Sequence, residues 1–206
     1  MNKLEKRGLL LMLAGLLLTS SALAIHLMQR QEDILAGQSA QMLLQQLELS
    51  RIEMPREEIP SAPEAEEEAA STVSPMPEKE YRGYRMIGSI QVPAVGVHLP
   101  VMSSWSEKLL KLAPCRYLGS LPEPGMVIMG HNYKSHFTPL HKVELGDEVI
   151  FEDVEGKIYR FTVDDIQILH RSEGEQLDSG YPLTLFTCTP GGLERRVIRC
   201  RNVPIE

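Results

Sequence analysis

Cysteine is scarce in this sequence, and the number and spacing of the cysteines limit disulfide formation and argue against a structural zinc site. There are three cysteines, Cys115, Cys188 and Cys200, so any intramolecular disulfide leaves at least one thiol over. No two of them form a CxxC pair, and the histidines and cysteines lack the spacing of a structural zinc site. We therefore expect no metal and no other cofactor.

An excess of positive charge is also missing. The 21 Lys and Arg against 28 Asp and Glu give a formal net charge of −7, which argues against nucleic-acid binding because that needs a basic face. Residues 51–80 hold nine acidic and three basic side chains, a net of −6, so the rest is close to neutral. Five prolines interrupt the same stretch. Residues 53–80 are expected to be a disordered, acidic, proline-rich linker.

Long apolar runs are absent except at the N-terminus. Residues 8–25 carry no charge and follow the basic residues Lys3, Lys6 and Arg7, and the apolar character continues to Met28. A run of about 20 residues can span a bilayer core of roughly 30 Å. Residues 22–24, Ala-Leu-Ala, would also suit cleavage of a signal peptide. We favour residues 1–28 as a cytoplasmic tip and uncleaved signal anchor; either alternative places the C-terminal part outside the cytoplasmic membrane.

Residues 29–52 predict a helix that continues from this run. Leucine, isoleucine and methionine recur among Gln and Glu in a partly amphipathic pattern. Two interpretations are open: a stalk, or a helix that packs on the following domain or on a partner. We favour the helical stalk.

Residues 81–206 contain short strand candidates separated by turn residues, as in a folded, mainly β domain. The strand candidates are residues 86–92, 97–101, 127–129, 148–151, 157–163, 183–187 and 195–201. Residues 105–112 predict the one convincing helix, with Ser103 or Ser104 as its N-cap. Roughly eight short strands with one or two short helices indicate a closed or nearly closed β-barrel.

Cys188 and His131 lie at the ends of two of these strands. Cys188 ends the apolar strand 183–187 and precedes a Pro-Gly-Gly loop, whereas His131 follows the strand 127–129. A thiol at a strand end is held by rigid backbone and stays accessible, as a nucleophile must be. The next strand opens with two candidate partners, Arg195 and Arg196. A single cysteine with a histidine elsewhere suits nucleophilic catalysis, and the alternative is an inert buried thiol with a surface histidine.

Three segments resemble the sortase family. Residues 184–188, TLFTC, match the TLxTC signature, and residues 130–132, GHN, resemble the segment with the family's catalytic histidine. Residues 195–199, RRVIR, resemble the strand with its arginine, and the order His, Cys, Arg is also the family's. The resemblance runs from about residue 87 to the end, so the barrel is expected to be sortase-like. The N-terminal anchor without a second C-terminal apolar segment resembles the class A and class B arrangement, with the subclass left open.

The resemblance implies a cysteine transpeptidase. Such an enzyme cuts an LPxTG-like sorting motif of a secreted protein through a Cys thioester and transfers the acyl group to an amine of the cell wall or a pilin. The implied catalytic residues are His131, Cys188 and Arg195, with Thr187, Asn132 and Arg196 as supporting or substrate-binding candidates. The implied partners are secreted proteins with a C-terminal sorting motif, a cell-wall precursor or pilin amine, and the membrane. The implied location is the cell membrane, single-pass, with the catalytic domain extracellular.

Several alternatives stay open. A secreted cysteine hydrolase would release its acyl group to water, and an inert surface β-barrel would only bind. Cys115 and Cys200 could pair, although two buried thiols are favoured. His136 and His141 are expected at the surface. The acidic residues 147–155 have spacing found in calcium sites and equally in ordinary turns, and turns are favoured.

Overall fold

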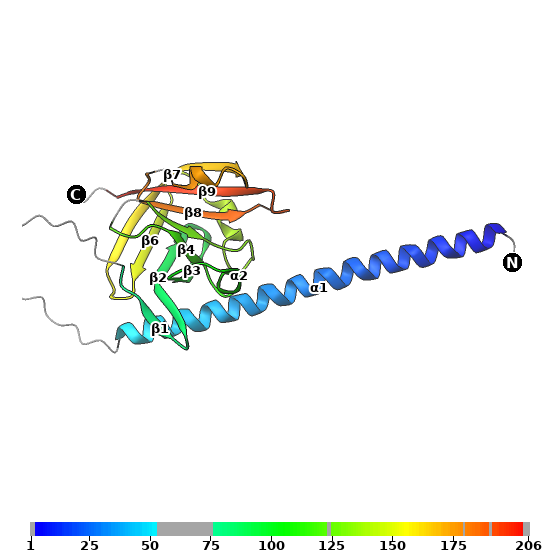
Figure 1. Ribbon diagram of the computed structural model, residues 1–206, viewed down its shortest axis with the longest axis horizontal. Coiled ribbons are helices and arrows are strands. Elements are labelled where there is room, and N and C mark those ends of the chain that lie inside the picture. Colours follow the sequence, from blue (N-terminus) through cyan, green and yellow to red (C-terminus); the bar gives the residue numbers. More distant parts are fainter. Residues whose placement is uncertain (1–2, 53–75, 123–124, 179, 190, 204–206) are drawn as a thin grey trace, which may run out of the picture. The chain divides into compact units, whose positions relative to one another are not determined.

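The computed structural model describes residues 3–52, 76–122, 125–178, 180–189 and 191–203, and Figure 1 shows their arrangement. The strands are β1 (Lys79–Tyr81), β2 (Tyr84–Val92), β3 (Val97–Met102), β4 (Cys115–Leu118), β5 (Met126–Met129), β6 (Glu148–Asp153), β7 (Ile158–His170), β8 (Leu183–Cys188) and β9 (Glu194–Asn202). The helices are α1 (Lys3–Ile52), α2 (Glu107–Leu110) and the short 3-10 turns η1 (Pro93–Val95), η2 (Thr138–Lys142) and η3 (Gly174–Leu177).

Eight of the strands close into a barrel. They pair in the order β2-β3-β4-β5-β8-β9-β7-β6, β6 pairs back onto β2, and β1 is an extra strand that pairs with the first residues of β2. The pairs β3–β4 and β5–β8 are parallel and the others antiparallel. Where the barrel closes, Gly88 on β2 lies so near the Glu152 carbonyl that a β-carbon would collide with it. The expected sortase-like barrel of about eight strands is confirmed.

Most predicted strands lie where the structure has strands, but the predicted ranges are shorter than the observed ones. β7 runs to His170, seven residues beyond the predicted end, because it continues as the partner of β9 after a register shift at residues 163–165. β1 and β4 were missed, since three or four residues carry too little periodicity to be recognised.

The predicted helix 105–112 and its N-cap were wrong in detail. Only α2, four residues, is α-helical, and its N-cap is Ser106, whose Oγ accepts a hydrogen bond from Leu109 N at 3.1 Å. Neither Ser103 nor Ser104 serves as the cap. Ser103 is buried, and its backbone N–H instead donates to Arg85 O.

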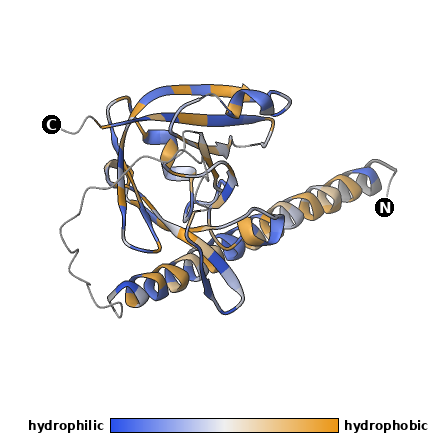
Figure 2. Ribbon diagram, turned by 60° about the vertical axis from the view of Figure 1, so that its left-hand side comes forward, coloured by the Kyte–Doolittle hydropathy of each residue, from blue (hydrophilic) through white to orange (hydrophobic). Residues whose placement is uncertain are grey.

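The first part of α1, up to Leu35, is a unit by itself. It contains a stretch long and apolar enough to cross a membrane, and Figure 2 shows its hydrophobic colouring after a hydrophilic start. Every side chain from Leu10 to Met28 is exposed. This helix is a candidate membrane anchor, although a signal sequence has the same length and composition.

The last part of α1, residues 36–52, packs on the barrel, which agrees with the second of the two interpretations of the predicted helix 29–52 and differs from the favoured stalk. Its inner side buries Ala36, Ala40, Leu43 and Leu47, which recur every three or four positions. Leu43 and Leu47 join a hydrophobic cluster with Met86, Met102, Ala113, Cys115 and Val154. Two of the four buried positions are alanines, which contribute little to an apolar pattern in the sequence. The predicted linker, apart from residues 76–80, lies outside the described residues.

Three polar contacts of Arg51 hold the end of this helix on the barrel. Arg51 forms an ion pair with Glu152 at 3.0 Å and also donates to the carbonyl oxygens of Glu152 and Asp153. Burial lowers the pKa of Arg51, and the carboxylates of Glu152, Asp153 and Glu48 oppose that shift. Residues from Ala36 onward thus form one compact unit with the barrel, whereas the catalytic domain was predicted to start at residue 81.

Candidate active site

The two faces of β8 separate its side chains into different environments. Leu183 and Leu185 point into the main core inside the barrel, and Phe186 belongs to a smaller outer cluster with Val127, Leu169, Leu177 and Val197. Because side chains alternate along a strand, Cys188 shares the outer face with Phe186. Cys188 is half-buried at the strand end. The thiol is therefore held by a buried strand and is still reachable from outside.

Strand β9 runs beside β8 (Figure 1), and the register places Arg195 directly opposite Cys188. Backbone bonds close the hairpin between them: Thr189 N donates to Glu194 O, and Gly192 N donates to Thr189 O, both at 2.9 Å. Residues paired in this way have Cα atoms about 4.5–5.5 Å apart. The guanidinium of Arg195 lies over the Phe186 ring, 5.4 Å from its centroid. The positive charge is thus held over the Phe186 ring, on the face of the sheet that Cys188 shares.

His131 reaches the same place from the other side of β8. β5 runs parallel to β8 with Met129 opposite Phe186, and Gly130 N extends the ladder by donating to Phe186 O at 3.0 Å. Two residues beyond Met129, His131 comes level with Cys188. By strand register, the three predicted catalytic residues therefore lie at the same end of the neighbouring strands β5, β8 and β9.

Thr187 and Arg196 do not share this face. Thr187 is fully buried on the inner side of β8, and Arg196 pairs with it across the ladder. The Arg196 guanidinium donates to Leu140 O and Val143 O, both at 3.1 Å, and so ties β9 to η2 and the residue after it. Of the two adjacent arginines, only Arg195 is on the face of Cys188.

Asn132 and Tyr133 follow His131 in a tightly turned segment. The Asn132 carbonyl accepts a hydrogen bond from Thr138 Oγ1 at 2.6 Å, and Asn132 itself is half-buried. The Tyr133 ring stacks on the His131 imidazole with centroids 3.7 Å apart and an angle of 16° between planes. Sequence reasoning missed Tyr133, because nothing in a residue two positions from a histidine indicates a face-to-face contact.

Cys115 and Cys200 are fully buried and free, so the alternative of a disulfide between them was wrong. Burial raises the pKa of Cys115 to about 12, partly opposed by a backbone hydrogen bond at Ser106. Burial, with a smaller contribution from the Asp164 carboxylate, also raises the pKa of Cys200. Neither thiol is available as a thiolate near neutral pH, which leaves Cys188 as the accessible one.

The histidines near His131 differ in exposure. His136 was expected at the surface and is instead buried, because Phe137 beside it packs against Gly130 and draws the segment inward. His141 is half-buried, and its pKa is lowered by burial and by the nearby Arg196 charge. His98 on β3 lies 3.8 Å from a Glu48 carboxylate oxygen on α1. Burial lowers the pKa of His98 more than that carboxylate raises it.

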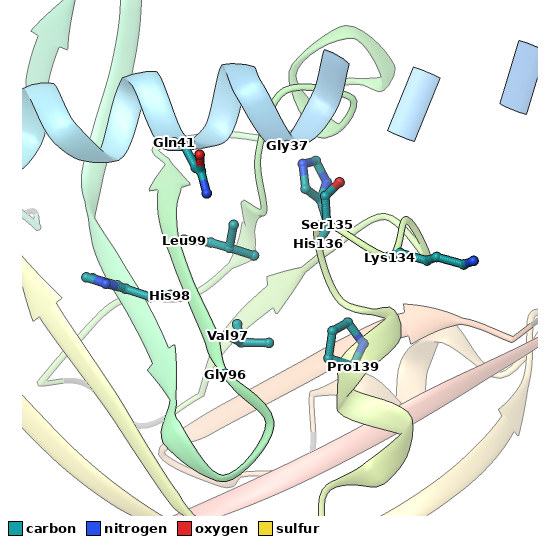
Figure 3. A pocket seen from close by; sticks show the side chains of 10 residues that line it. All are labelled: Gly37, Gln41, Gly96, Val97, His98, Leu99, Lys134, Ser135, His136 and Pro139. Atoms are coloured by element: carbon teal, nitrogen blue, oxygen red, sulfur yellow. The ribbon is translucent and has the colours of Figure 1, made fainter. Parts of the chain in front are cut away.

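A hollow of ≈ 220 Å³ lies behind the His131 segment (Figure 3). Gly37 and Gln41 of α1 line one side, and Ser135 and His136 line another. A β-carbon on Gly37 would lie 2.9 Å from Ser135 Cβ, which is closer than such atoms pack. The helix therefore touches the segment that carries His131.

The acidic residues considered for calcium serve turns instead. Asp153 Oδ1 accepts from the backbone N–H groups of Glu155 and Lys157, both at 2.9 Å. Asp147 Oδ2 accepts from Glu144 N at 2.9 Å. Among the residues that the structure describes, no group of three or more His, Cys, Asp or Glu side chains is arranged to hold a metal ion.

Several solved sortase structures are similar to this chain in fold. Sortase C1 of GBS pilus island 1 is 27% identical with a TM-score of 0.53, over 59% of this chain and 66% of its own. Sortase A from Corynebacterium diphtheriae is 27% identical with a TM-score of 0.54, over 60% and 63%. Sortase C1 from Streptococcus suis is 28% identical with a TM-score of 0.53, over 59% and 74%. The chain thus spans just under two thirds of the first of these proteins.

Sequence comparison gives two further results. No curated protein sequence matches the chain significantly. The family model described as the sortase domain matches residues 90–203, which is more than half of the chain and includes β5, β8 and β9. With the barrel topology and the strand-end cluster of His131, Cys188 and Arg195, this match establishes that the chain belongs to the sortase family.

Proposed function

We propose that this chain is a cysteine transpeptidase that cleaves an LPxTG-like sorting motif in secreted proteins and transfers the new acyl end to an amine. The observation that supports the proposal is the strand register, which brings the ends of β5, β8 and β9 side by side with His131, Cys188 and Arg195 at them. Family membership supports the reaction class, and the sorting motif and the acceptor are part of the proposal.

The first half of the proposed reaction forms a thioester. The Cys188 thiolate attacks the scissile carbonyl carbon, and nearby cationic groups favour the thiolate over the thiol. The carbonyl oxygen gains negative charge, which the guanidinium of Arg195 stabilises through its N–H groups. His131 donates a proton to the departing amine as the peptide bond breaks.

The second half reverses these steps with a new amine. The incoming amine attacks the thioester carbon, loses a proton to His131, and displaces Cys188 as a thiolate. A new amide bond replaces the thioester, and the enzyme returns to its starting state. A cell-wall precursor or a pilin lysine is the proposed acceptor, because the candidate membrane helix would hold the domain near the surface where such amines occur.

The test uses the full chain in detergent micelles with fluorogenic peptides that carry LPxTG-like motifs, with and without triglycine as acceptor. We expect cleavage and a peptide–triglycine product from the wild type and neither from Cys188→Ala. His131→Ala should lower the rate by about 10²–10⁴-fold, the usual contribution of general acid–base catalysis. Cys188-dependent cleavage that ignores triglycine would instead support a hydrolase. A folded chain that cleaves no peptide would support an inert binding module.

A further inference from the structure

The closest ring contact near the candidate active site is the one between His131 and Tyr133. Their centroids are 3.7 Å apart and their planes differ by 16°, so the phenol ring covers one face of the imidazole. Tyr133 also meets His136 edge-on, with centroids 5.4 Å apart at 61°. The Tyr133 ring therefore contacts both His131 and the buried His136.

Backbone hydrogen bonds hold Tyr133 in this position. The Tyr133 carbonyl accepts from His136 N at 3.0 Å and from Thr138 N at 3.1 Å. His131 O accepts from Phe137 N at 3.1 Å, which closes the segment on itself. Phe137 is fully buried against Gly130, where a β-carbon would collide with its ring. Tyr133 therefore lies in a turn that backbone hydrogen bonds close and that the buried Phe137 holds against the core.

The helix α1 supports the same turn from behind. Gly37 lies against Ser135, two residues after Tyr133, and both line the hollow shown in Figure 3. Ala40 on the same side of the helix is buried in the main core. The turn is thus packed between the barrel end and the helix, which restricts the ring of Tyr133 to one side of His131.

We propose that Tyr133 is a positioning residue for His131: its ring fixes the plane of the imidazole beside Cys188 and stabilises the protonated imidazolium. A cation over an aromatic face is attracted by the negative charge of the ring face, and the attraction is stronger when the pair is shielded from water. The importance of this contact for turnover rests on the proposed function of His131, whereas the stacking and its effect on protonation do not.

Other charges near His131 act on the same equilibrium. By strand register, Cys188 on β8 and Arg195 on β9 face it, and Tyr133 and His136 belong to its own turn. A Cys188 thiolate favours the imidazolium, and the Arg195 guanidinium opposes it. Substitutions of Tyr133 leave Cys188 and Arg195 in place, so a change in the protonation of His131 measures the effect of the Tyr133 ring.

The test follows the six histidines of the full chain in detergent micelles by NMR over a pH series, with His131 assigned from a His131→Gln variant. In Tyr133→Leu we expect the titration midpoint of His131 to fall by about half a pH unit. Tyr133→Phe keeps the ring face and should keep the wild-type midpoint. Tyr159→Leu, which removes a ring from β7, is the control for general destabilisation and should also keep it.

A second readout is alkylation of Cys188 by iodoacetamide across the same pH range. It needs no turnover, and the burial of Cys115 and Cys200 leaves Cys188 as the reacting thiol. In Tyr133→Leu the pH profile should lose reactivity on its acid side, while Tyr133→Phe restores it. With a cleavable peptide, kcat should fall about 5–20-fold with KM little changed, consistent with a group that acts in the transition state.

Failure of the proposed function and failure of this inference are distinguishable. If no peptide is cleaved but the His131 midpoint falls in Tyr133→Leu and not in Tyr133→Phe, the positioning role stands without the transpeptidase. An unchanged midpoint and an unchanged alkylation profile in Tyr133→Leu would overturn it. Should that variant not fold, the wild type still decides: His131 ring protons without the upfield shift caused by a stacked ring would refute the contact.

Discussion

Two adjacent arginines in β9 have different surroundings and should have separable effects. Arg195 lies on the face of Cys188 over the Phe186 ring, with a half-buried side chain. Arg196 points the other way, where its guanidinium donates to two backbone carbonyls of the residues that follow His131. One arginine is therefore available to a substrate, and the other holds the barrel end together.

Replacing each arginine by alanine tests this division. Arg195→Ala should lower kcat/KM by about 10²–10³-fold, because an oxyanion donor is lost, and should change the free energy of unfolding by less than about 0.5 kcal/mol. Arg196→Ala should lower the free energy of unfolding by about 2 kcal/mol, because two carbonyls lose a charged donor. Urea unfolding and peptide cleavage measure the two effects. A destabilised Arg195→Ala beside a stable, inactive Arg196→Ala would reverse the assignment.

At the scale of the element, α1 joins two parts with different surfaces. Its side chains from Leu10 to Met28 are exposed, whereas residues 36–52 bury one side against the barrel and leave the other in water. Leu47 is 1% exposed in the cluster with Met86 and Met102, and Leu49 on the opposite side is 46% exposed. Two leucines of the same helix therefore differ only in their surroundings, one buried against the barrel and one exposed to solvent.

Replacing Leu47 or Leu49 by alanine compares the free energy of unfolding at a buried and an exposed site of the same helix. Leu47→Ala should lower the free energy of unfolding by about 2–4 kcal/mol, the usual cost of emptying a buried leucine site. Leu49→Ala should change it by less than about 0.5 kcal/mol, with the same change in helix propensity. Urea unfolding followed by the fluorescence of Trp105, the single tryptophan, measures both. Equal small effects would mean that α1 does not pack on the barrel in solution.

At the scale of the whole molecule, the folded unit includes part of the helix. The barrel closes through β2 and β6, and α1 covers the apolar side chains Met86, Met102 and Val154 that the closed sheet leaves outside. Arg51 bonds to the end of β6 through Glu152 and Asp153, near the closure of the sheet. The helix thus completes a second small core on the outside of the barrel.

Truncation tests this boundary. A chain that begins at Ala36 should keep the thermal midpoint of the barrel in the full chain. A chain that begins at Met76 lacks the helix, exposes its cluster, and should unfold about 10 °C lower or more, because several kcal/mol of burial are lost. Differential scanning calorimetry of both chains measures the change. Identical midpoints would show that the domain begins after the linker, as the sequence suggested.

The catalytic assignment owed much to local sequence. The TLFTC and GHN segments, each at the end of an apolar strand, were enough to nominate Cys188 and His131, and β5 and β8 were found where expected. The choice of Arg195 over Arg196 remained open, because alternation shows only that the two arginines point in opposite directions. Which direction leads to Cys188 depends on the pairing of β9 with β8.

The sequence by itself determined the features that neighbouring residues encode: the apolar N-terminal helix, the strand and turn punctuation, and the residues of the candidate site. Tertiary structure alone decided the packing of residues 36–52, the burial of His136, the free state of Cys115 and Cys200, and the stacking of Tyr133 on His131. The physical reason is one of range. Periodicity and turn propensity act within a few residues, whereas burial, register and ring contacts arise between segments that only the closed barrel brings together.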